Sequence, residues 1–299
     1  MILGALEAGG TKMVCSIGTA EGQVLEQVSY PTTSPEETMP KIIGFFKDAK
    51  VDAVGIGCFG PLDLNPASPT YGCITTTPKL LWRNYPILAE MRSQLGVPAA
   101  IDTDVNAAAL AEATLGAAKG LDSCLYVTIG TGVGGGVFIG GKLVHGLVHP
   151  EFGHMLLRVE ADDPLPHGVC PYHDGCLEGL AAGPSIGERW GKKAYELAPD
   201  HPAWDLEARY LAQMCVNAIV SFSPEKIILG GGVMQQKHPF PLIHRYVLKL
   251  LGGYVQHPMI LEHIDQYIVE PGLDTKSGVT GALLLARDAR RSRENTSQK

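Results

Sequence analysis

The sequence predicts an α/β protein with two similar halves. One pattern, a strand followed by a turn of glycine and threonine and then a second strand, occurs at residues 3–14 and again at 125–141. The recurrence of such a unit within one chain indicates an internal duplication. Between and after these hairpins, apolar runs typical of buried strands alternate with helix-like segments. We therefore expect an N-terminal α/β domain over residues 1–117 and a C-terminal α/β domain over residues 118–299.

In the first half, glycine-containing turns separate three predicted strands at residues 2–6, 13–17 and 24–30. Ser34, Pro35 and two acidic residues after them form a helix start, which predicts a helix to about residue 50. The other expected elements are a buried strand at 51–58, a helix at 87–95, a short strand at 99–101 and an alanine-rich helix at 107–115.

The second half is expected to begin after a boundary within residues 116–123. Its first hairpin has strands at 125–129 and 137–139, joined by a turn that contains the glycines of 130–136. The later elements are helices at 204–221, 241–251 and 278–289 and strands at 226–229 and 267–270. Residues 290–299 are polar and rich in charge, so we expect them to be disordered.

Composition excludes several classes of protein. The net charge is −7 and no run of Lys or Arg stands out before the tail, so a nucleic-acid partner is not expected. No window is long and apolar enough for a membrane helix, and the N-terminus enters a strand without a signal peptide, which favours a cytoplasmic protein. Seven cysteines, two of them close to histidines, indicate reduced thiols and a metal site and not a disulfide framework.

Both glycine-rich turns are candidate phosphate sites. Glycine allows positive φ and lets backbone N–H groups approach an anion closely, although a plain tight hairpin explains one such turn equally well. The second copy favours the phosphate interpretation. In the first turn we expect Gly10 and Thr11 to hold phosphate oxygens, Lys12 to add positive charge and Glu7 to orient a water on Mg²⁺. The matching residues of the second turn are Gly130, Thr131 and Gly132.

Two carboxylates, Asp102 and Asp104, flank Thr103 where a predicted strand meets a predicted helix. Either carboxylate could simply cap the helix, because an aspartate at this position commonly accepts hydrogen bonds from the first turn. The loop at residues 59–63, which contains Gly60, follows the carboxyl end of another strand, where ligands of α/β sheets bind.

Four residues form the strongest local signal in the chain. Cys170, His173 and Cys176 are separated by two residues each, and His154 lies a short distance upstream. This spacing predicts a closed tetrahedral Zn²⁺ site of structural type, within a loop of about residues 154–178. The loop is too poor in apolar residues to hold itself by a core, so a metal would stabilise it. Free cysteines and surface histidines are the alternative.

Glu151 and Glu178 lie next to this metal motif. Together with His154 they suit the pairs of hydroxyl groups on a sugar, because each accepts hydrogen bonds in a fixed geometry. Solvated surface carboxylates are an equally simple interpretation of either glutamate alone. A further glycine-rich segment follows the strand at 226–229, and its glycines would let a flat ring or a phosphate lie close to the backbone.

These motifs, in this order, resemble the ROK family (repressors, open reading frames and sugar kinases), and most closely its bacterial fructokinases. The resemblance runs nearly from end to end. The segments that carry it are Glu7-Ala-Gly-Gly-Thr-Lys12, Asp104-Val-Asn-Ala-Ala-Ala109, Thr128-Ile-Gly-Thr-Gly132, Glu151-Phe-Gly-His154 and Cys170-x2-His173-x2-Cys176-Leu-Glu178-Gly179.

The resemblance implies a duplicated actin-like ATPase fold of the hexokinase type, with two domains that close over ATP and a sugar. It implies that Asp104 is the catalytic base and that His154 binds both sugar and zinc. The other implied sugar contacts are Glu151, Glu178, Thr103 and Gly60. The implied nucleotide contacts are Gly10, Thr11, Lys12, Gly130, Thr131, Gly132, Gly183, Pro184, Gly231, Gly232, Val233, Met234 and Gln235.

The expected activity is ATP-dependent phosphorylation of a hexose, D-fructose to fructose 6-phosphate, with Mg²⁺ bound to ATP and a homodimeric enzyme. Thr103 stands where kinases of the family often have Asn, and His173 stands in a segment that is often richer in Cys, which favours the fructokinase branch. Kinases for glucose, mannose or N-acetylmannosamine and a non-catalytic sugar-binding regulator are the alternatives. A DNA-binding repressor of this family would carry a helix-turn-helix before the first strand, which begins here at about Ile2.

Overall fold

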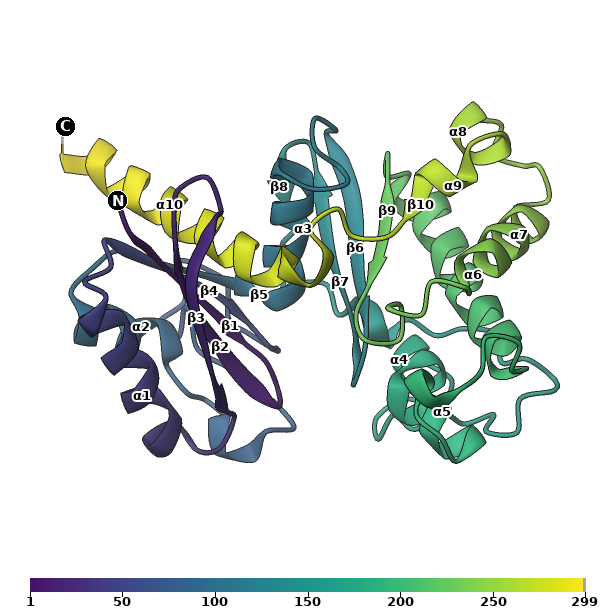
Figure 1. The fold of residues 1–299 in the computed structure, drawn as a ribbon, viewed down its shortest axis with the longest axis horizontal. Coiled ribbons are helices and arrows are strands. Elements are labelled where there is room, and N and C mark those ends of the chain that lie inside the picture. The colour runs from purple at the N-terminus through teal and green to yellow at the C-terminus, as the bar shows by residue number, and fades with distance from the viewer. Residues whose placement is uncertain (298–299) are drawn as a thin grey trace. The chain divides into compact units, whose positions relative to one another are not determined.

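The computed structural model describes residues 1–297, and they form two compact units (Figure 1). The first unit contains residues 1–114, 143–150 and the chain from Lys276 onwards, and the second contains 115–142 and 151–275. The main division lies near the predicted one at 117/118. The units differ from the two continuous domains expected, because the C-terminal helix and a short central segment belong to the first unit.

The first unit is built on a five-stranded sheet in the order β3-β2-β1-β4-β5. β1 (Leu3–Ala8) is antiparallel to β2 (Lys12–Gly18) and parallel to β4 (Ala53–Cys58). β3 (Val24–Pro31) extends the antiparallel edge and β5 (Ala99–Thr103) the parallel one. The carboxyl ends of β1, β4 and β5 therefore lie at one edge of the sheet, where the turns after Ala8, Cys58 and Thr103 meet.

The second unit repeats this topology. Its sheet order, taken from the other edge, is β8-β7-β6-β9-β10. β6 (Ser123–Ile129) is antiparallel to β7 (Val133–Ile139) and parallel to β9 (Ile227–Gly230). β8 (Lys142–Leu143) and β10 (Ile268–Val269) form the edges. The duplication predicted from the two hairpins is confirmed by this correspondence of strands.

Helices cover both faces of the first sheet. Apolar residues of α1 (Pro35–Asp48) and α2 (Ile87–Leu95) pack on one face in a core with Leu6 and Ile56. α3 (Asp104–Thr114) follows β5, and α10 (Ser277–Ser297) packs along β1, β4 and α3. A short 3₁₀ turn, η1 (Leu80–Trp82), lies in the connection between β4 and α2.

The helices of the second unit include two, α6 (Ala203–Phe222) and α7 (Phe240–Leu251), that the sequence predicted. The short helices were not predicted: they are α4 (Leu177–Ala181), α5 (Gly183–Trp190), α8 (Pro258–Leu261) and α9 (Ile264–Tyr267), with the 3₁₀ turns η2 (Phe152–His154), η3 (Ala194–Glu196) and η4 (Asp274–Lys276). Over the described part of the chain, none of the helices combines the length and apolar character that crossing a membrane requires.

Two expectations about local structure are wrong. The glycines of 134–136 lie inside β7 and not in the turn, and Gly135 is needed there because a Cβ would lie 2.8 Å from the ring of Phe152. The predicted disorder at 290–299 is replaced by helix as far as Ser297, since α10 continues past the sheet, and residues 298–299 lie outside the described chain.

Glycine lets α10 approach the first sheet more closely than other residues would. A Cβ on Gly55 of β4 would overlap the carbonyl oxygen of Ala282, and a Cβ on Gly281 would overlap the carbonyl oxygen of Ala107 in α3. The interface around α10 is formed by small and apolar residues such as Ala5 and Ala286, all fully buried. Close contact between backbones, together with buried side chains such as Leu3 and Leu283, thus covers this face of the sheet.

We expect Gly281→Ala to lower the free energy of unfolding by at least about 1–3 kcal/mol, because the methyl group must displace α10 from α3. Gly44→Ala is the matched control, since Gly44 also lies inside a helix but has no atom within 4 Å of the added Cβ. That change should leave stability unchanged or raise it by up to ~1 kcal/mol. Denaturant unfolding of the two variants tests this, and equal effects would contradict the packing role of Gly281.

Candidate active site and metal centre

Asp104 is the first residue of α3, at the carboxyl end of β5. The cap of this helix is Thr103, whose Oγ1 accepts the Asn106 N–H at 3.1 Å, while Asp104 Oδ1 accepts the N–H of Val105 at 2.9 Å. Asp102 is buried, and its Oδ1 accepts hydrogen bonds from Thr103 N and Asn106 Nδ2, both at 2.8 Å. The hydroxyl of Thr103 therefore caps the helix, and the half-buried carboxyl of Asp104 lies at the sheet edge where ligands bind in α/β folds.

The first glycine turn is held by a hydrogen bond within its own backbone and by one from the residue that follows β3. Gly9 N donates to Lys12 O at 3.0 Å, and Thr32 Oγ1 donates to Gly9 O at 2.7 Å. Thr11 and Lys12 are exposed. A Cβ on Gly10 would lie 3.3 Å from Cε of Lys79, so a second lysine lies beside this turn. Sequence reasoning missed Lys79, because its neighbour across the turn is far away in the chain.

A cavity of about 380 Å³ adjoins this lysine. Thr32, Glu37 and Trp82 line it together with Lys79. Trp82 is buried, and its Nε1 donates to the carbonyl of Thr33 at 2.6 Å. Trp82 therefore forms an ordered wall of the cavity, and Lys79 places a positive charge beside the turn that contains Gly10.

Glu7 lies in β1 just before the same turn. Burial raises the pKa of its carboxyl, and the nearby charge of Lys12 lowers it in part. A Cβ on Gly278 would lie 2.8 Å from Cδ of Glu7, so only glycine leaves room for this carboxylate. A carboxylate held in such a cradle fits Mg²⁺ carried by a nucleotide, because Mg²⁺ commonly takes one or two carboxylates and otherwise keeps water and phosphate oxygens.

The loop that contains Gly60 is attached to a histidine from a distant segment. The N–H of Leu62 donates to Nε2 of His149 at 2.9 Å, and the imidazole is buried. Burial lowers the pKa of His149, so the ring is neutral and can accept this hydrogen bond. The sequence did not suggest a role for His149.

In the second unit, the three glycine segments predicted to bind nucleotide meet through their backbones. Gly183 N donates to Gly130 O at 2.7 Å, and Val233 N donates to Ile129 O at 2.9 Å. Gly231 has φ +88° and its Cβ would overlap the backbone of Ile129. Val233 and Met234 are buried, whereas Thr131, Gly232 and Gln235 are exposed beside Gly132 and Pro184, at the turns and helix start where a nucleotide could be reached.

Glu178 is hydrogen-bonded to the chain directly after the second glycine turn, residues 130–132. Its Oε2 accepts the N–H of Val133 at 2.9 Å, and a Cβ on Gly132 would lie 2.6 Å from the same oxygen. Desolvation raises the pKa of Glu151, and the negative charge of Glu178 raises it further. The structure thus places Glu151 and Glu178 in one electrostatic environment, with His154 three residues after Glu151 on η2.

The four predicted metal ligands converge. Their ligand atoms all lie within 4.8 Å of one another. Nδ1 of His154 lies 3.9 Å from Sγ of Cys170 and 3.7 Å from Sγ of Cys176, and Nδ1 of His173 lies 3.6 Å from Sγ of Cys170. Ligands at Zn–S and Zn–N bond lengths in a tetrahedron are separated by about 3.5 Å, so this set fits Zn²⁺.

A backbone hydrogen bond positions the sulfur of Cys176 as a metal ligand. Its Sγ accepts the N–H of Gly179 at 3.4 Å at the start of α4. Burial raises the pKa of the Cys176 thiol to about 11 in the absence of a cation. A bound cation reverses that shift, so metal binding must release protons and must weaken as the pH falls.

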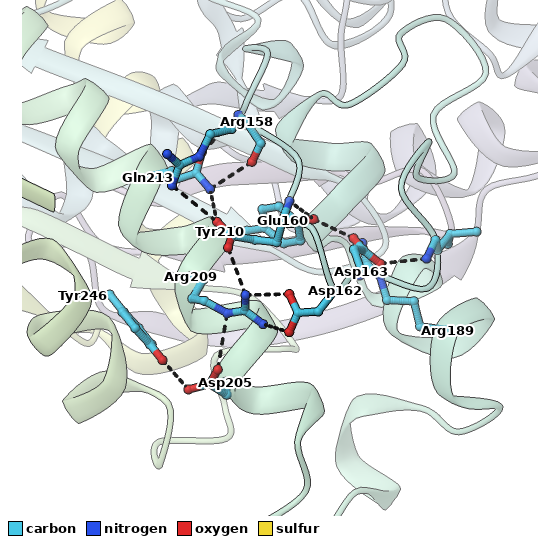
Figure 2. A network of polar contacts seen from close by, with 11 residues as sticks. Arg158, Glu160, Asp162, Asp163, Arg189, Asp205, Arg209, Tyr210, Gln213 and Tyr246 are labelled. Atoms are coloured by element: carbon cyan, nitrogen blue, oxygen red, sulfur yellow. Dashed lines mark hydrogen bonds and ion pairs between the residues drawn. The ribbon is translucent and has the colours of Figure 1, made fainter. Parts of the chain in front are cut away.

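Ion pairs hold another part of the same loop (Figure 2). Asp163 pairs with Arg189 of α5 at 2.7 Å and accepts the hydroxyl of Tyr210 at 2.6 Å, with both charged side chains almost fully buried. Arg209 of α6 bonds Glu160 at 2.9 Å and Asp162 at 2.7 Å. The loop therefore has an anchor besides the metal motif. The sequence did not reveal it because the arginines lie on helices farther along the chain.

Comparison with known proteins gives the family and the fold. The sequence profile of the ROK family matches residues 3–289. The chain belongs to the ROK family. A fructokinase of Pediococcus pentosaceus, itself a relative of this ROK protein, is 48% identical over 290 residues, which cover 97% of this chain and 99% of that protein.

Solved ROK structures have the same architecture. The ROK hexokinase of Thermus thermophilus superposes with a TM-score of 0.78 at 29% identity, covering 98% of this chain and all of that one. A ROK family glucokinase of Streptomyces griseus, in complex with glucose and AMPPNP, gives a TM-score of 0.78 at 26% identity over 96% of this chain and all of that one. The actin-like ATPase fold of the hexokinase type, expected from the sequence, is confirmed by these structures.

We expect one zinc ion per chain, lost when Cys170 is replaced by Ser, because thiolate sulfur is the softer and stronger ligand. Cys73→Ser is the matched control, since Cys73 is also half-buried but lies outside the cluster. Elemental analysis of the purified variants measures the metal. Full zinc content in the Cys170→Ser protein would contradict the assignment.

Removal of the metal should free only part of the loop. Hydrogen exchange of the chelated protein is expected to rise at residues 164–176 and to stay low at 160–163, which the arginines hold. Uniform loss of protection over 155–178 would mean that the metal alone anchors the loop.

Proposed function

We propose that this protein transfers the γ-phosphoryl group of ATP to D-fructose and releases ADP and fructose 6-phosphate. The placement of Asp104 carries the proposal: a half-buried carboxyl at the carboxyl edge of the first sheet, next to a helix cap that Thr103 supplies. The choice of sugar is supported by 48% identity to a fructokinase over nearly the whole chain, against 26% to a glucokinase.

Asp104 acts as the general base. The sugar hydroxyl oxygen forms a bond to the γ-phosphorus while the bond from that phosphorus to the β–γ bridging oxygen breaks, and ADP leaves. Asp104 accepts the hydroxyl hydrogen bond before the reaction and takes the proton late. Positioning and electrostatic stabilisation supply most of the rate in phosphoryl transfer, so the groups that hold the reactants matter as much as the base.

Hydrogen-bond acceptors of this chain bind the sugar. Glu151, His154 and Glu178 accept hydrogen bonds from its hydroxyl groups, and Thr103 and the loop at Gly60 complete the contacts. His154, Cys170, His173 and Cys176 would hold zinc in a structural role, and a bound ion would fix His154 and the start of α4, which carries Glu178 two residues after Cys176.

The nucleotide is bound by the glycine turns. The N–H groups and hydroxyls around Gly10, Thr11, Gly130, Thr131 and Gly132 hold phosphate oxygens, and Lys12 and Lys79 add positive charge. The adenosine lies against Gly183, Pro184 and the segment Gly231, Gly232, Val233, Met234, Gln235. Glu7 is the residue of this chain that would orient a water on Mg²⁺, and Mg²⁺ bound to ATP would offset charge on its phosphates. We also propose a homodimer, which light scattering of the purified protein would test.

The function is tested by ADP release with Mg·ATP and fructose, glucose, mannose or N-acetylmannosamine, using zinc-loaded protein. Turnover with fructose far above the other three is the expected result. Preference for another of these sugars would keep the kinase and replace its substrate. No turnover with any sugar, together with retained sugar binding by calorimetry, would favour a non-catalytic regulator.

Asp104→Asn should lower kcat by a factor of at least about 100 and leave the dissociation constant of the sugar nearly unchanged, because the amide keeps the hydrogen bond but cannot take the proton. Asp48→Asn is the control, since Asp48 is an exposed carboxylate at the end of α1. Steady-state kinetics and calorimetry measure the two effects. Near-normal turnover of the Asp104 variant would show that another group is the base.

A further inference from the structure

A short excursion of the chain, residues 143–150, groups with the first unit although the chain before and after it belongs to the second. It is attached at two places. Nε2 of His145 lies 2.8 Å from Oδ2 of Asp102, and Nε2 of His149 accepts the N–H of Leu62. Both contacts reach segments that the proposed mechanism uses, the β5–α3 junction and the loop at Gly60.

The contact of His145 with Asp102 is the one that bears on the proposed base. The carboxylate of Asp102 is buried and lies two residues before the proposed base, Asp104. Oδ1 is taken by Thr103 N and Asn106 Nδ2, and Oδ2 faces His145. A buried carboxylate without a counter-charge would be costly in itself and would raise the proton affinity of a second carboxylate close by.

His145 is suited to supply that counter-charge. Its hydrogen bond to Asp102 raises the pKa of the imidazole, and the side chain remains 40% exposed, so it can exchange protons with solvent. Two further titratable groups, His149 and Cys58, are uncharged near neutral pH. His149 is neutral because burial lowers its pKa, and the pKa of the Cys58 thiol on β4 is raised well above its usual value by burial and by Asp104.

We propose that His145 is a positioning residue for phosphoryl transfer, which neutralises Asp102 and thereby keeps Asp104 ionised at the start of α3. The inference depends on the proposed function, because it concerns the base of that reaction. His145 acts through a chain of hydrogen bonds. It bonds to Asp102, and Asp102 bonds to Asn106 and Thr103, which form the first turn of the helix that carries Asp104.

The charges of His145 and Asp102 determine the direction in which the pH profile of kcat moves. With His145 protonated, the pair with Asp102 is neutral, and Asp104 loses its proton at low pH. Replacement of His145 by Gln leaves a buried negative charge two residues before Asp104, so Asp104 is expected to hold its proton to higher pH. The acidic limb of the pH profile of kcat must then move upward.

The experiment compares His145→Gln, His145→Lys, Asp102→Asn and the double variant Asp102→Asn/His145→Gln, with the sugar that the wild type phosphorylates best. His145→Gln should shift the acidic limb up by about one pH unit and so lower kcat by about tenfold at pH values on that limb, with little change in the KM for ATP. His145→Lys keeps a positive charge, and the double variant removes the negative one, so both should recover most of the activity. His263→Gln, at an exposed position at the start of α9, is the control.

An acidic limb that does not move in His145→Gln, or a double variant no more active than His145→Gln, would overturn the proposal. If His145→Gln does not fold, His145→Lys and Asp102→Asn/His145→Gln still decide it, because a purely steric role for His145 predicts that both are inactive. An inactive wild type would refute the proposed function, whereas an active wild type with no effect of His145 would refute this inference alone.

Discussion

Close approach of backbones at glycine is the constraint on which both units depend. In the first unit it lets α10 lie against β4 and α3 at Gly55 and Gly281. In the second, main-chain hydrogen bonds join Gly130 to Gly183 at the start of α5 and Ile129 to Val233, and Gly231 lies against the backbone of Ile129. Packing of this kind leaves no space for a methyl group at Gly55, Gly281 or Gly231, so the positions of these segments are set by the main chain and not by adjustable side chains.

Three acidic side chains, two of them buried and one half-buried, share a second feature. Asp102 has a histidine and two N–H donors, Asp163 has Arg189 and Tyr210, and Glu178 has the N–H of Val133. An ionised group in a protein interior is tolerated only when it is paired and hydrogen-bonded. These partners fix three turns, β5–α3, the loop after His154 and the turn after β6, so the electrostatic pairs also determine where the site residues lie.

Sequence reasoning succeeded where the signal is local. The hairpins, the helix over 87–95 and the convergence of His154, Cys170, His173 and Cys176 follow from periodicity and spacing. It failed where the partner is distant. The contacts of His145 with Asp102, of Lys79 with the turn at Gly10, and of Arg189 with Asp163 join residues with no common pattern. One sequence read by itself gives no sign of such pairings, because nothing in the residues next to each partner distinguishes it from an ordinary polar residue.

The position of α10 has a consequence for biosynthesis. The face of the first sheet around Leu3, Ala5 and Ala53 is covered by the last helix of the chain. While the ribosome still holds the later residues, this sheet has one finished face and one bare apolar face. The first unit can complete its folding only after the second has been synthesised, so this apolar face stays uncovered for most of translation.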